Sequence, residues 1–186
     1  MELDEYRKHF ELEENHWWFL GRRDIMLTIL DGLDSLPAEG RILDVLSHQT
    51  IKSDLEVLSD TYRLLKKGGF LLVCDSAFNF LLSWHDRAFH IRERYTSRGM
   101  IEKLGQAGFE VLKSSYFSFI LFIPIVLFRF WDKLWKGNKY PPVSHLNRVN
   151  RSVNSLLYRI FRAAAPLLRH IRLPFGSSLL CVAKKK

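Results

Sequence analysis

The run from Phe70 to Asp75 constrains the fold of this chain more than any other feature. Its first five residues are all apolar, and Gly68-Gly69 stands directly before them. A short uninterrupted apolar run bounded by glycine is typical of a buried strand in a parallel sheet that helices cover on both faces. The run therefore predicts an α/β fold.

The segments around this run alternate between helical and strand patterns. Helices are predicted over residues 3–20, 22–33, 53–67, 95–106 and 146–171, and further strands over 41–46, 109–116 and 177–183. Ser53 followed by Glu56 is a capping-box pattern, which indicates where the third helix begins. Strand–helix–strand units with right-handed crossovers give a mainly parallel sheet. We expect the 186 residues to form a single domain over residues 1–186.

Charge is divided unevenly along the chain. Residues 1–100 hold 13 Lys and Arg against 17 Asp and Glu, a net −4, whereas residues 101–186 hold 15 against 3, a net +12. Such asymmetry indicates either that the C-terminal half contacts an anionic partner, such as a phospholipid surface or a nucleic acid, or that it carries a solvated basic face. No recognised nucleic-acid-binding motif accompanies these charges, so a nucleic-acid partner is the least favoured.

The two cysteines, Cys74 and Cys181, lie far apart in apolar runs and match no metal-binding or redox spacing. Free cysteines in such runs behave as small buried hydrophobic residues, which indicates a reducing compartment. The first 15 residues are acidic and lack the apolar core of a secretory signal. A cytoplasmic location is expected.

Residues 117–131 form an apolar run that Pro124 and Arg129 interrupt. A helix needs ~20 apolar residues to cross a bilayer, so this segment is too short to span one unaided. Two interpretations remain. The segment lies in the bilayer interface with Trp131 and Trp135 as anchors, or it covers the sheet as a buried helix.

The predicted helix over residues 146–171 is basic and amphipathic. Its apolar residues recur on one face, while Arg148, Arg151, Arg159 and Arg162 lie largely outside that face. Pro166 is expected to kink or end the helix. Together with the apolar run it forms a helical insertion over residues 117–172, before the last strand.

A basic amphipathic helix beside an apolar segment suits a membrane surface. Trp131, Trp135 and the four arginines are therefore the expected membrane-surface residues, and the inner membrane face is the expected place. The alternative is a cover helix with a solvated basic face. The sequence does not indicate an oligomeric state.

Several motifs resemble one branch of the class I methyltransferases that use S-adenosylmethionine (SAM). Residues 16–23 are similar to the family's lead-in to its first strand, and residues 40–45 to that strand itself. The other similar segments are residues 64–70 before the fifth strand, 84–87 and 94–96 after it, 107–111 before the sixth strand, and 173–178 before the last strand. In this order they cover most of the chain.

The segment after the first strand departs from the family. There the strand leads into a Gly-x-Gly loop, whose backbone approaches the cofactor as only glycine permits. In this chain Leu46-Ser47-His48-Gln49 follows Val45, and no glycine stands between Gly40 and Gly68. The tripeptide 43–45 is similar to both the first and the fourth strand of the family. We interpret the chain as a shortened form, joined through this tripeptide, that lacks the glycine loop and the second and third strands.

The resemblance implies a particular sheet and function. The family's strand order is 3-2-1-4-5-7-6, so the shortened form would keep a hybrid strand followed by 5-7-6. This is a truncated Rossmann-like sheet of about four strands, mostly parallel with an antiparallel last strand, with flanking helices. The implied function is that of a SAM-dependent methyltransferase for a small or lipid-linked acceptor, inactive here because the SAM loop is absent. The alternative is a non-catalytic membrane-peripheral α/β module or the product of a decayed gene.

The resemblance also implies residues on the cofactor side. Asp44 would lie at the end of the first strand, beside SAM, and Trp17 and Trp18 would stack on the cofactor or the acceptor. The alternatives are a strand-end carboxylate for Asp44 and simple packing for the two tryptophans.

On the substrate side the resemblance implies His48 and the loop residues His85, Asp86, Arg94 and Tyr95. These residues would lie where ligands bind in open α/β sheets, at the carboxyl ends of the strands. The alternatives are an ordinary loop histidine and a structural ion-pair loop. A metal site is a further alternative, but His85 and His90 are five residues apart without a clear third ligand, so we expect no metal.

Overall fold

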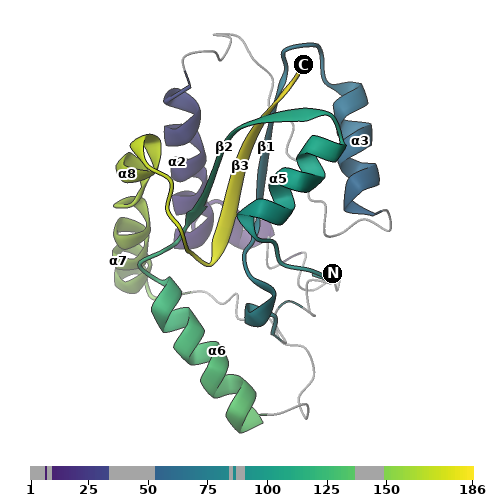
Figure 1. The fold of residues 1–186 in the computed structure, drawn as a ribbon. Helices are drawn as coiled ribbons and strands as arrows, with labels where there is room; N and C mark the ends of the chain where they lie inside the picture. Colours follow the sequence, from purple (N-terminus) through teal and green to yellow (C-terminus); the bar gives the residue numbers. More distant parts are fainter. Residues whose placement is uncertain (1–6, 8–9, 34–52, 84–85, 87–90, 137–148) are drawn as a thin grey trace.

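The computed structural model describes residues 7, 10–33, 53–83, 86, 91–136 and 149–186. Figure 1 shows a small sheet with helices on both of its faces and one helix, α6, that projects from the base of the sheet. The predicted strand at 41–46, Asp44, His48, His85 and Arg148 lie outside the described residues.

The described strands are β1 (Phe70–Ser76), β2 (Phe109–Phe117) and β3 (Ser178–Lys185). The described helices are α2 (Trp17–Asp31), α3 (Asp54–Leu64), α5 (Ser97–Gln106), α6 (Phe122–Lys136), α7 (Arg151–Arg162) and α8 (Ala165–His170), with a short 3-10 helix η2 (Asn79–Leu81) after β1.

The prediction of a mostly parallel sheet of about four strands is wrong. The described sheet has three strands in the order β1-β3-β2, and both pairings are antiparallel. The physical reason is the place of the C-terminal strand: β3 runs opposite to β1 and β2 and lies between them, so every hydrogen-bonded pair includes it. A continuous apolar run indicates that a strand is buried on both faces, but it does not determine the direction of the neighbouring strand.

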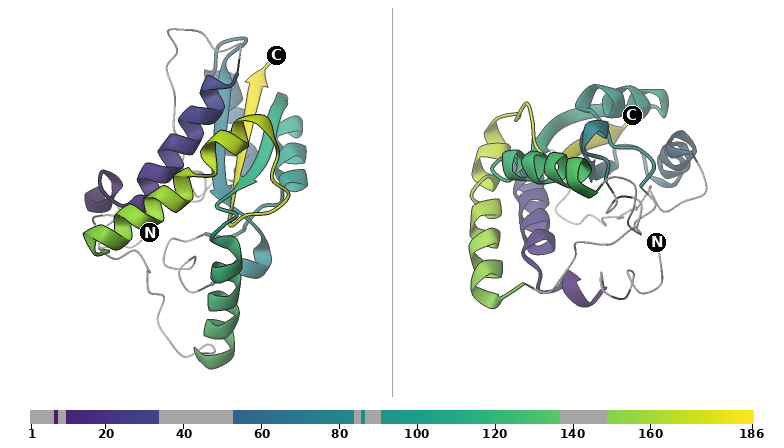
Figure 2. Two further views of the ribbon diagram at one scale, coloured as in Figure 1. Left: turned by 90° about the vertical axis from the view of Figure 1, so that its left-hand side faces the viewer. Right: turned by 90° about the horizontal axis from the view of Figure 1, so that it is seen from below.

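The central strand β3 supplies side chains to two apolar layers, because successive residues of a strand point to opposite faces. Leu179, Cys181 and Ala183 pack with α3 and α5, and Leu180 and Val182 pack on the side of α2, α7 and α8. All five side chains are almost completely buried. Figure 2 shows the two groups of helices on opposite sides of the sheet.

The helix boundaries follow local signals. Ser53 and Glu56 form the predicted capping box at the start of α3, with N–H to side-chain distances of 3.3 Å and 2.9 Å. The predicted break near Pro166 is confirmed, since α7 ends at Arg162 and Pro166 lies in the first turn of α8, where proline is tolerated. The predicted boundary near Gly21 is wrong. Gly21 lies inside α2, and the ring of Phe161 packs against it so closely that a Cβ atom would come within 2.2 Å of the ring.

We expect Gly176→Ala to destabilise the fold. A Cβ atom at this position would lie 2.1 Å from the carbonyl oxygen of Phe117 and 2.9 Å from its carbonyl carbon, so the backbone before β3 would have to move. Overpacking of this kind lowers the free energy of unfolding by about 1–3 kcal/mol. Thermal unfolding measures the change. Gly105→Ala is the control, because a Cβ on that α5 residue would meet nothing within 4 Å. Equal stability of the two variants would contradict the clash.

Candidate functional site

Polar side chains meet at the carboxyl end of β1, on the face of the sheet that α3 and α5 cover. Asp54 in the first turn of α3 accepts hydrogen bonds from the hydroxyl of Tyr95 and, at 2.7 Å, from Lys103 Nζ. Lys103 also donates to Glu93 at 3.1 Å. Burial alone would raise the pKa of Asp54, but the hydrogen bonds from Lys103 and Tyr95 outweigh burial and hold it below its ordinary value.

Asp75 lies near the end of β1 and is buried, with 9% of its surface exposed. By strand alternation it shares its face with Val73 and Leu71, toward α3. Its Oδ1 atom accepts the backbone N–H of Ser76 at 2.7 Å. Burial raises the pKa of Asp75 to about 6, and the negative charge of Asp54 acts in the same direction. A buried carboxylate with a raised pKa is a recognised sign of a functional site.

Asp86 is completely buried at the centre of an ion network behind this cluster. Arg94 donates to its Oδ1 from Nε at 3.1 Å and from Nη2 at 2.6 Å, while Ser83 and Arg129 donate to its Oδ2. Arg94 also donates to the carbonyl of Ala77, at the end of β1. Burial alone would raise the pKa of Asp86, but the two arginines hold it below its ordinary value. The network ties Asp86 and Arg94 to Ala77, the residue that follows β1.

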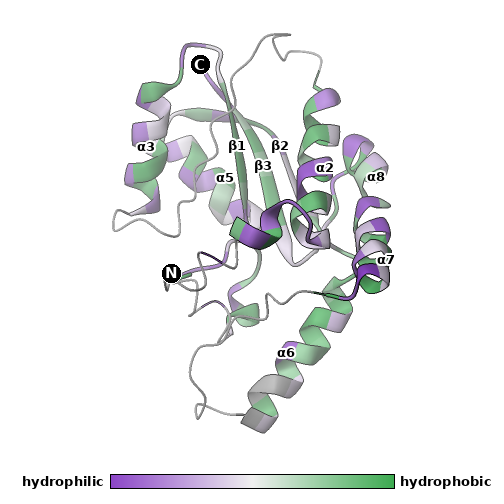
Figure 3. Ribbon diagram, turned by 180° about the vertical axis from the view of Figure 1, so that it is seen from behind, coloured by the Kyte–Doolittle hydropathy of each residue, from purple (hydrophilic) through white to green (hydrophobic). Residues whose placement is uncertain are grey.

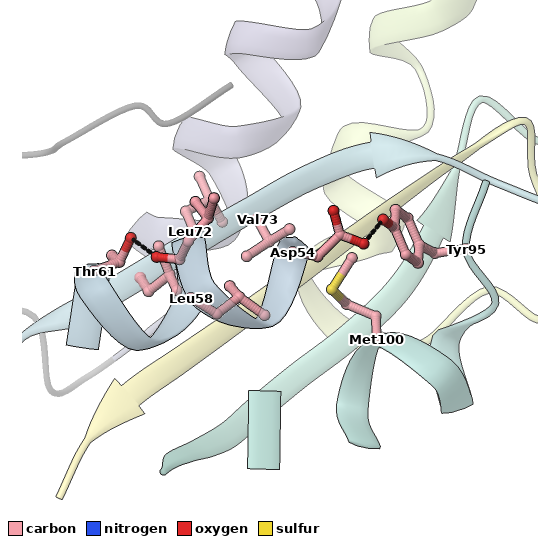
Figure 4. A pocket seen from close by; sticks show the side chains of 9 residues that line it. Asp54, Leu58, Thr61, Leu72, Val73, Tyr95 and Met100 are labelled. Carbon is pink, nitrogen blue, oxygen red and sulfur yellow. Dashed lines mark hydrogen bonds between the residues drawn. The ribbon is translucent and has the colours of Figure 1, made fainter. Parts of the chain in front are cut away.

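A small cavity lies between α3 and β1, close to Asp54 and Tyr95. Figure 4 shows both side chains at one end of the cavity with Met100, and Leu58 and Thr61 farther along α3. Its volume of about 30 Å³ admits one or two water molecules. This cavity therefore does not fit SAM or another nucleoside.

The two predicted cofactor-side tryptophans pack in the opposite layer. Trp17 meets Phe161 of α7 edge-on, with ring centroids 5.5 Å apart, and Trp18 packs against Phe19 and under the guanidinium of Arg22. Both belong to the apolar layer of α2 and α7, across the sheet from Asp54 and Asp75. The structure thus joins Asp86 to Arg94, places Tyr95 with Asp54, and places Trp17 and Trp18 across the sheet from Asp54.

A bulky residue with a positive φ follows β1. Phe78 has φ 63°, a backbone region that side chains of this size rarely adopt. Its ring stacks on Tyr116 of β2 at 4.8 Å and also contacts the rings of Phe80 and Phe122. Strain of this kind persists only where the surrounding contacts hold it, and it is common at functional sites.

Helix α6 carries most of its apolar residues on the outside. Seven of them expose more than half of their surface: Ile123, Leu127, Phe128, Phe130, Trp131, Leu134 and Trp135. Their spacing of three and four residues places them on one broad face. Arg129 lies on the other side of the helix and binds Asp86 at 2.9 Å. Figure 3 shows the hydrophobic colouring of α6 where the helix leaves the body of the protein. No helix among the described residues is long and apolar enough to cross a membrane.

Trp131 and Trp135 stack on each other near the far end of α6, with ring centroids 4.9 Å apart. Of the predicted basic residues, Arg151, Arg159 and Arg162 are exposed on α7. Arg162 lies 3.4 Å from Asp24 of α2, so part of its charge is balanced within the fold.

Sequence reasoning missed Asp54, Asp75, Lys103 and Arg129 as site residues. Two of them carried a visible signal, because Asp75 ends an apolar strand and Arg129 interrupts an apolar run. Asp54 and Lys103 carried none, since their partners lie 41 and 49 residues away in the chain. Within the described residues, no group of three or more His, Cys, Asp or Glu side chains could hold a metal ion.

Comparison with protein-family models gives no match, and no curated protein matches the sequence at a significant level.

Proposed function

We propose that this chain is a non-catalytic, membrane-peripheral module that binds anionic lipid bilayers through α6. The observation that carries the proposal is the orientation of this helix. An amphipathic helix of a globular protein buries its apolar stripe against the core. In α6 the apolar stripe faces solvent, while Arg129 on the opposite side is held by Asp86.

A bilayer would cover this apolar face. Burying a Leu or Phe side chain completely is worth about 1.5–3 kcal/mol, so the exposed stripe of α6 offers a substantial free energy of transfer. The ion pair with Asp86 also keeps Arg129 out of the hydrocarbon, where a charged side chain is costly.

The length of α6 supports a position in the interface. Its 15 residues extend over about 22 Å at 1.5 Å per residue, which is shorter than the ~30 Å hydrocarbon core. Helices of this kind lie in the plane of the headgroups. Tryptophan is enriched at that depth, and Trp131 and Trp135 are both exposed on the apolar face.

The charge of the C-terminal half favours anionic lipids. Residues 101–186 carry a net +12, and basic residues near an anionic surface contribute about 1 kcal/mol each. The exposed arginines of α7 follow α6 in the sequence. Binding is therefore expected to weaken as salt concentration rises.

Vesicle co-sedimentation tests the proposal. We expect the full chain to bind vesicles of equimolar phosphatidylcholine and phosphatidylglycerol more tightly than vesicles of phosphatidylcholine alone. The variant Phe130→Glu/Leu134→Glu is expected to bind at least roughly 100-fold more weakly, because two apolar side chains leave the interface and two negative charges enter it. Leu64→Glu is the control, since Leu64 is exposed on α3 at the other end of the sheet. Unchanged binding of the α6 variant would reject the proposal.

A second candidate is SAM-dependent methyl transfer to a small or lipid-linked acceptor. The observation that favours it is the order of the described strands: β3 lies between β1 and β2, as strand 7 lies between strands 5 and 6 in the family. Titration calorimetry with SAM tests this candidate on the purified full chain. Micromolar binding would support methyl transfer and contradict a non-catalytic module. No binding by a folded sample would reject the candidate.

A further inference from the structure

Helix α7 is held against α2 along one side only. The ring of Phe161 packs against Gly21, and the hydroxyl of Tyr158 donates a hydrogen bond to Asp24 at 2.5 Å. Asn154, on the same side, accepts a backbone N–H of α2 at 2.9 Å. Since helical residues three and four positions apart share a face, these contacts determine which side of α7 turns away from α2.

The outer side of α7 keeps an apolar stripe. Val153 and Leu156 are 46% and 58% exposed, and Ile160, four residues after Leu156, is partly buried. Spacings of three and four residues place these side chains in one row along the helix. A helix that only covered the core would bury its apolar row. In α7 the core takes up Phe161, whereas Val153 and Leu156 remain about half exposed.

Arginines accompany this stripe. Arg151 and Arg159 are exposed, and within the described part of the chain neither forms an ion pair with a carboxylate. Arg162, in contrast, lies 3.4 Å from Asp24. Residues 133–186 contain 12 Lys and Arg and no Asp or Glu, so the sequence around α7 supplies no counter-charge of its own. The outer side of α7 is therefore both apolar and positively charged.

The exposed apolar face of α6 is turned toward the same side of the protein. Arg129 lies opposite that face and donates to the carbonyl of Leu81 in η2 and to Asp86. Figures 1 and 2 show the short helix η2, directly after β1, on one side of α6 and α7 on the other. Because Arg129 points toward η2, the apolar face of α6 is turned to the side on which α7 lies. A single flat surface on that side can contact both helices.

We propose that α7 lies on the same bilayer surface as α6, with Val153 and Leu156 in the interface and Arg151 and Arg159 at the lipid phosphates. This inference rests on the proposed membrane binding of α6. The occupant is an anionic bilayer, because an apolar stripe beside arginines complements both of its layers. Acyl chains cover the apolar side chains, and guanidinium groups make charge-assisted hydrogen bonds to phosphate oxygens.

Paired glutamine substitutions test the phosphate contacts on vesicles of equimolar phosphatidylcholine and phosphatidylglycerol. Arg151→Gln/Arg159→Gln is expected to weaken binding by roughly tenfold or more, because two positive charges leave the lipid surface. Arg63→Gln/Arg98→Gln is the matched control, since both side chains are exposed on the helices that cover the other face of the sheet. The control lowers the net charge equally but is expected to bind nearly as the parent, because charges beyond the Debye length of about 8 Å are screened at physiological salt.

Paired serine substitutions test the apolar contacts on the same vesicles. Val153→Ser/Leu156→Ser is expected to weaken binding by roughly tenfold, because two apolar side chains no longer enter the interface. Ile101→Ser/Leu64→Ser is the matched control, since these exposed side chains lie on α5 and α3. This control is expected to bind like the parent.

The outcomes separate this inference from the proposed function. If both α7 variants bind like their controls while Phe130→Glu/Leu134→Glu does not bind, α7 does not contact the membrane and the inference is wrong. If Phe130→Glu/Leu134→Glu also binds like the parent, the proposed function itself fails. If the serine variant of α7 turns a dimer into a monomer in sedimentation velocity and vesicle binding is unchanged, the outer side of α7 is an interface between copies of this chain, and the inference is again wrong.

A single-site probe keeps the test decisive if the serine variant does not fold. Leu156→Cys carries an environment-sensitive fluorophore, and we expect its emission to shift to the blue on vesicles. The same label at Phe130→Cys reports the contact of α6, and at Leu64→Cys it is expected not to shift. The labelled parent chain corrects for the partly exposed Cys74. A blue shift at Phe130 without one at Leu156 would overturn the inference and leave the proposed function intact.

Discussion

Replacing Arg94 by methionine is expected to lower the free energy of unfolding by about 3–5 kcal/mol. Arg94 and Asp86 are both almost completely buried, and Arg94 makes two hydrogen bonds to the carboxylate. The methionine side chain fills part of the volume but leaves Asp86 with fewer donors. Arg129 and Ser83 still donate to Asp86, but removing one partner of a buried ion pair is among the most destabilising changes that one substitution makes.

Urea unfolding of the full chain measures this loss. The control is Arg98→Met on α5, where Arg98 pairs with Glu102 at 2.9 Å and its side chain is 90% exposed. Exposed pairs of this spacing contribute about 0.3–0.5 kcal/mol, so the control should remain close to the parent. If both variants lose the same stability, the Asp86 network does not stabilise the fold as its geometry indicates. Since domains are stable by only about 5–15 kcal/mol, the loss of Arg94 would be a large fraction of the total.

Asp75→Asn is expected to stabilise the protein above about pH 6. Burial raises the pKa of Asp75 from 3.8 to about 6, so the folded state holds its proton at pH values where the unfolded state has released it. Stability from this group is therefore present at low pH and falls as pH rises from about 4 to 6. Since one pKa unit corresponds to about 1.4 kcal/mol, the ionised carboxylate lowers the free energy of unfolding by roughly 3 kcal/mol at neutral pH.

Urea unfolding at about pH 4 and about pH 8 tests this expectation. The asparagine variant should exceed the parent by about 1–3 kcal/mol at the higher pH and by much less at the lower, where Asp75 is protonated in the folded state and only about half ionised in the unfolded state. Asparagine keeps an acceptor for the Ser76 N–H, so the comparison isolates the charge. Glu110→Gln removes an exposed carboxylate from β2 and serves as the control. An advantage of Asp75→Asn that is equal at both pH values would contradict a raised pKa.

Local elements were predictable because their signals are local. The three strands lie within two residues of the predicted runs, since glycines and apolar periodicity determine where a strand begins and ends. The capping box of Ser53 and Glu56 and the break at Pro166 involve neighbours in the chain, and both were predicted. The direction of strand pairing was not predicted, because β3 reaches its place between β1 and β2 from the far end of the chain.

The site residues show the same difference between local signals and long-range contacts. Asp86, Arg94 and Tyr95 were candidates from their place in the loop after β1, and the alternative of a structural ion-pair loop agrees with the buried bonds between Asp86 and Arg94. Asp75 was not a candidate, because its raised pKa comes from burial and from Asp54 on another element. Neither the burial of Asp75 nor its distance from Asp54 can be obtained from the residue and its neighbours in the sequence.

Helix α6 shows most clearly what the sequence determines and what only the tertiary structure determines. Its apolar length, its interruption at Arg129 and the tryptophans near its end are properties of the sequence, and they left two interpretations open, a buried cover helix or an interfacial one. Only the tertiary structure decided which face turns outward. Arg129 finds its carboxylate in Asp86, 43 residues earlier in the chain, because an unpaired buried charge would be costly. That ion pair turns the side of α6 that carries Arg129 toward the body of the protein and leaves the broad apolar face exposed.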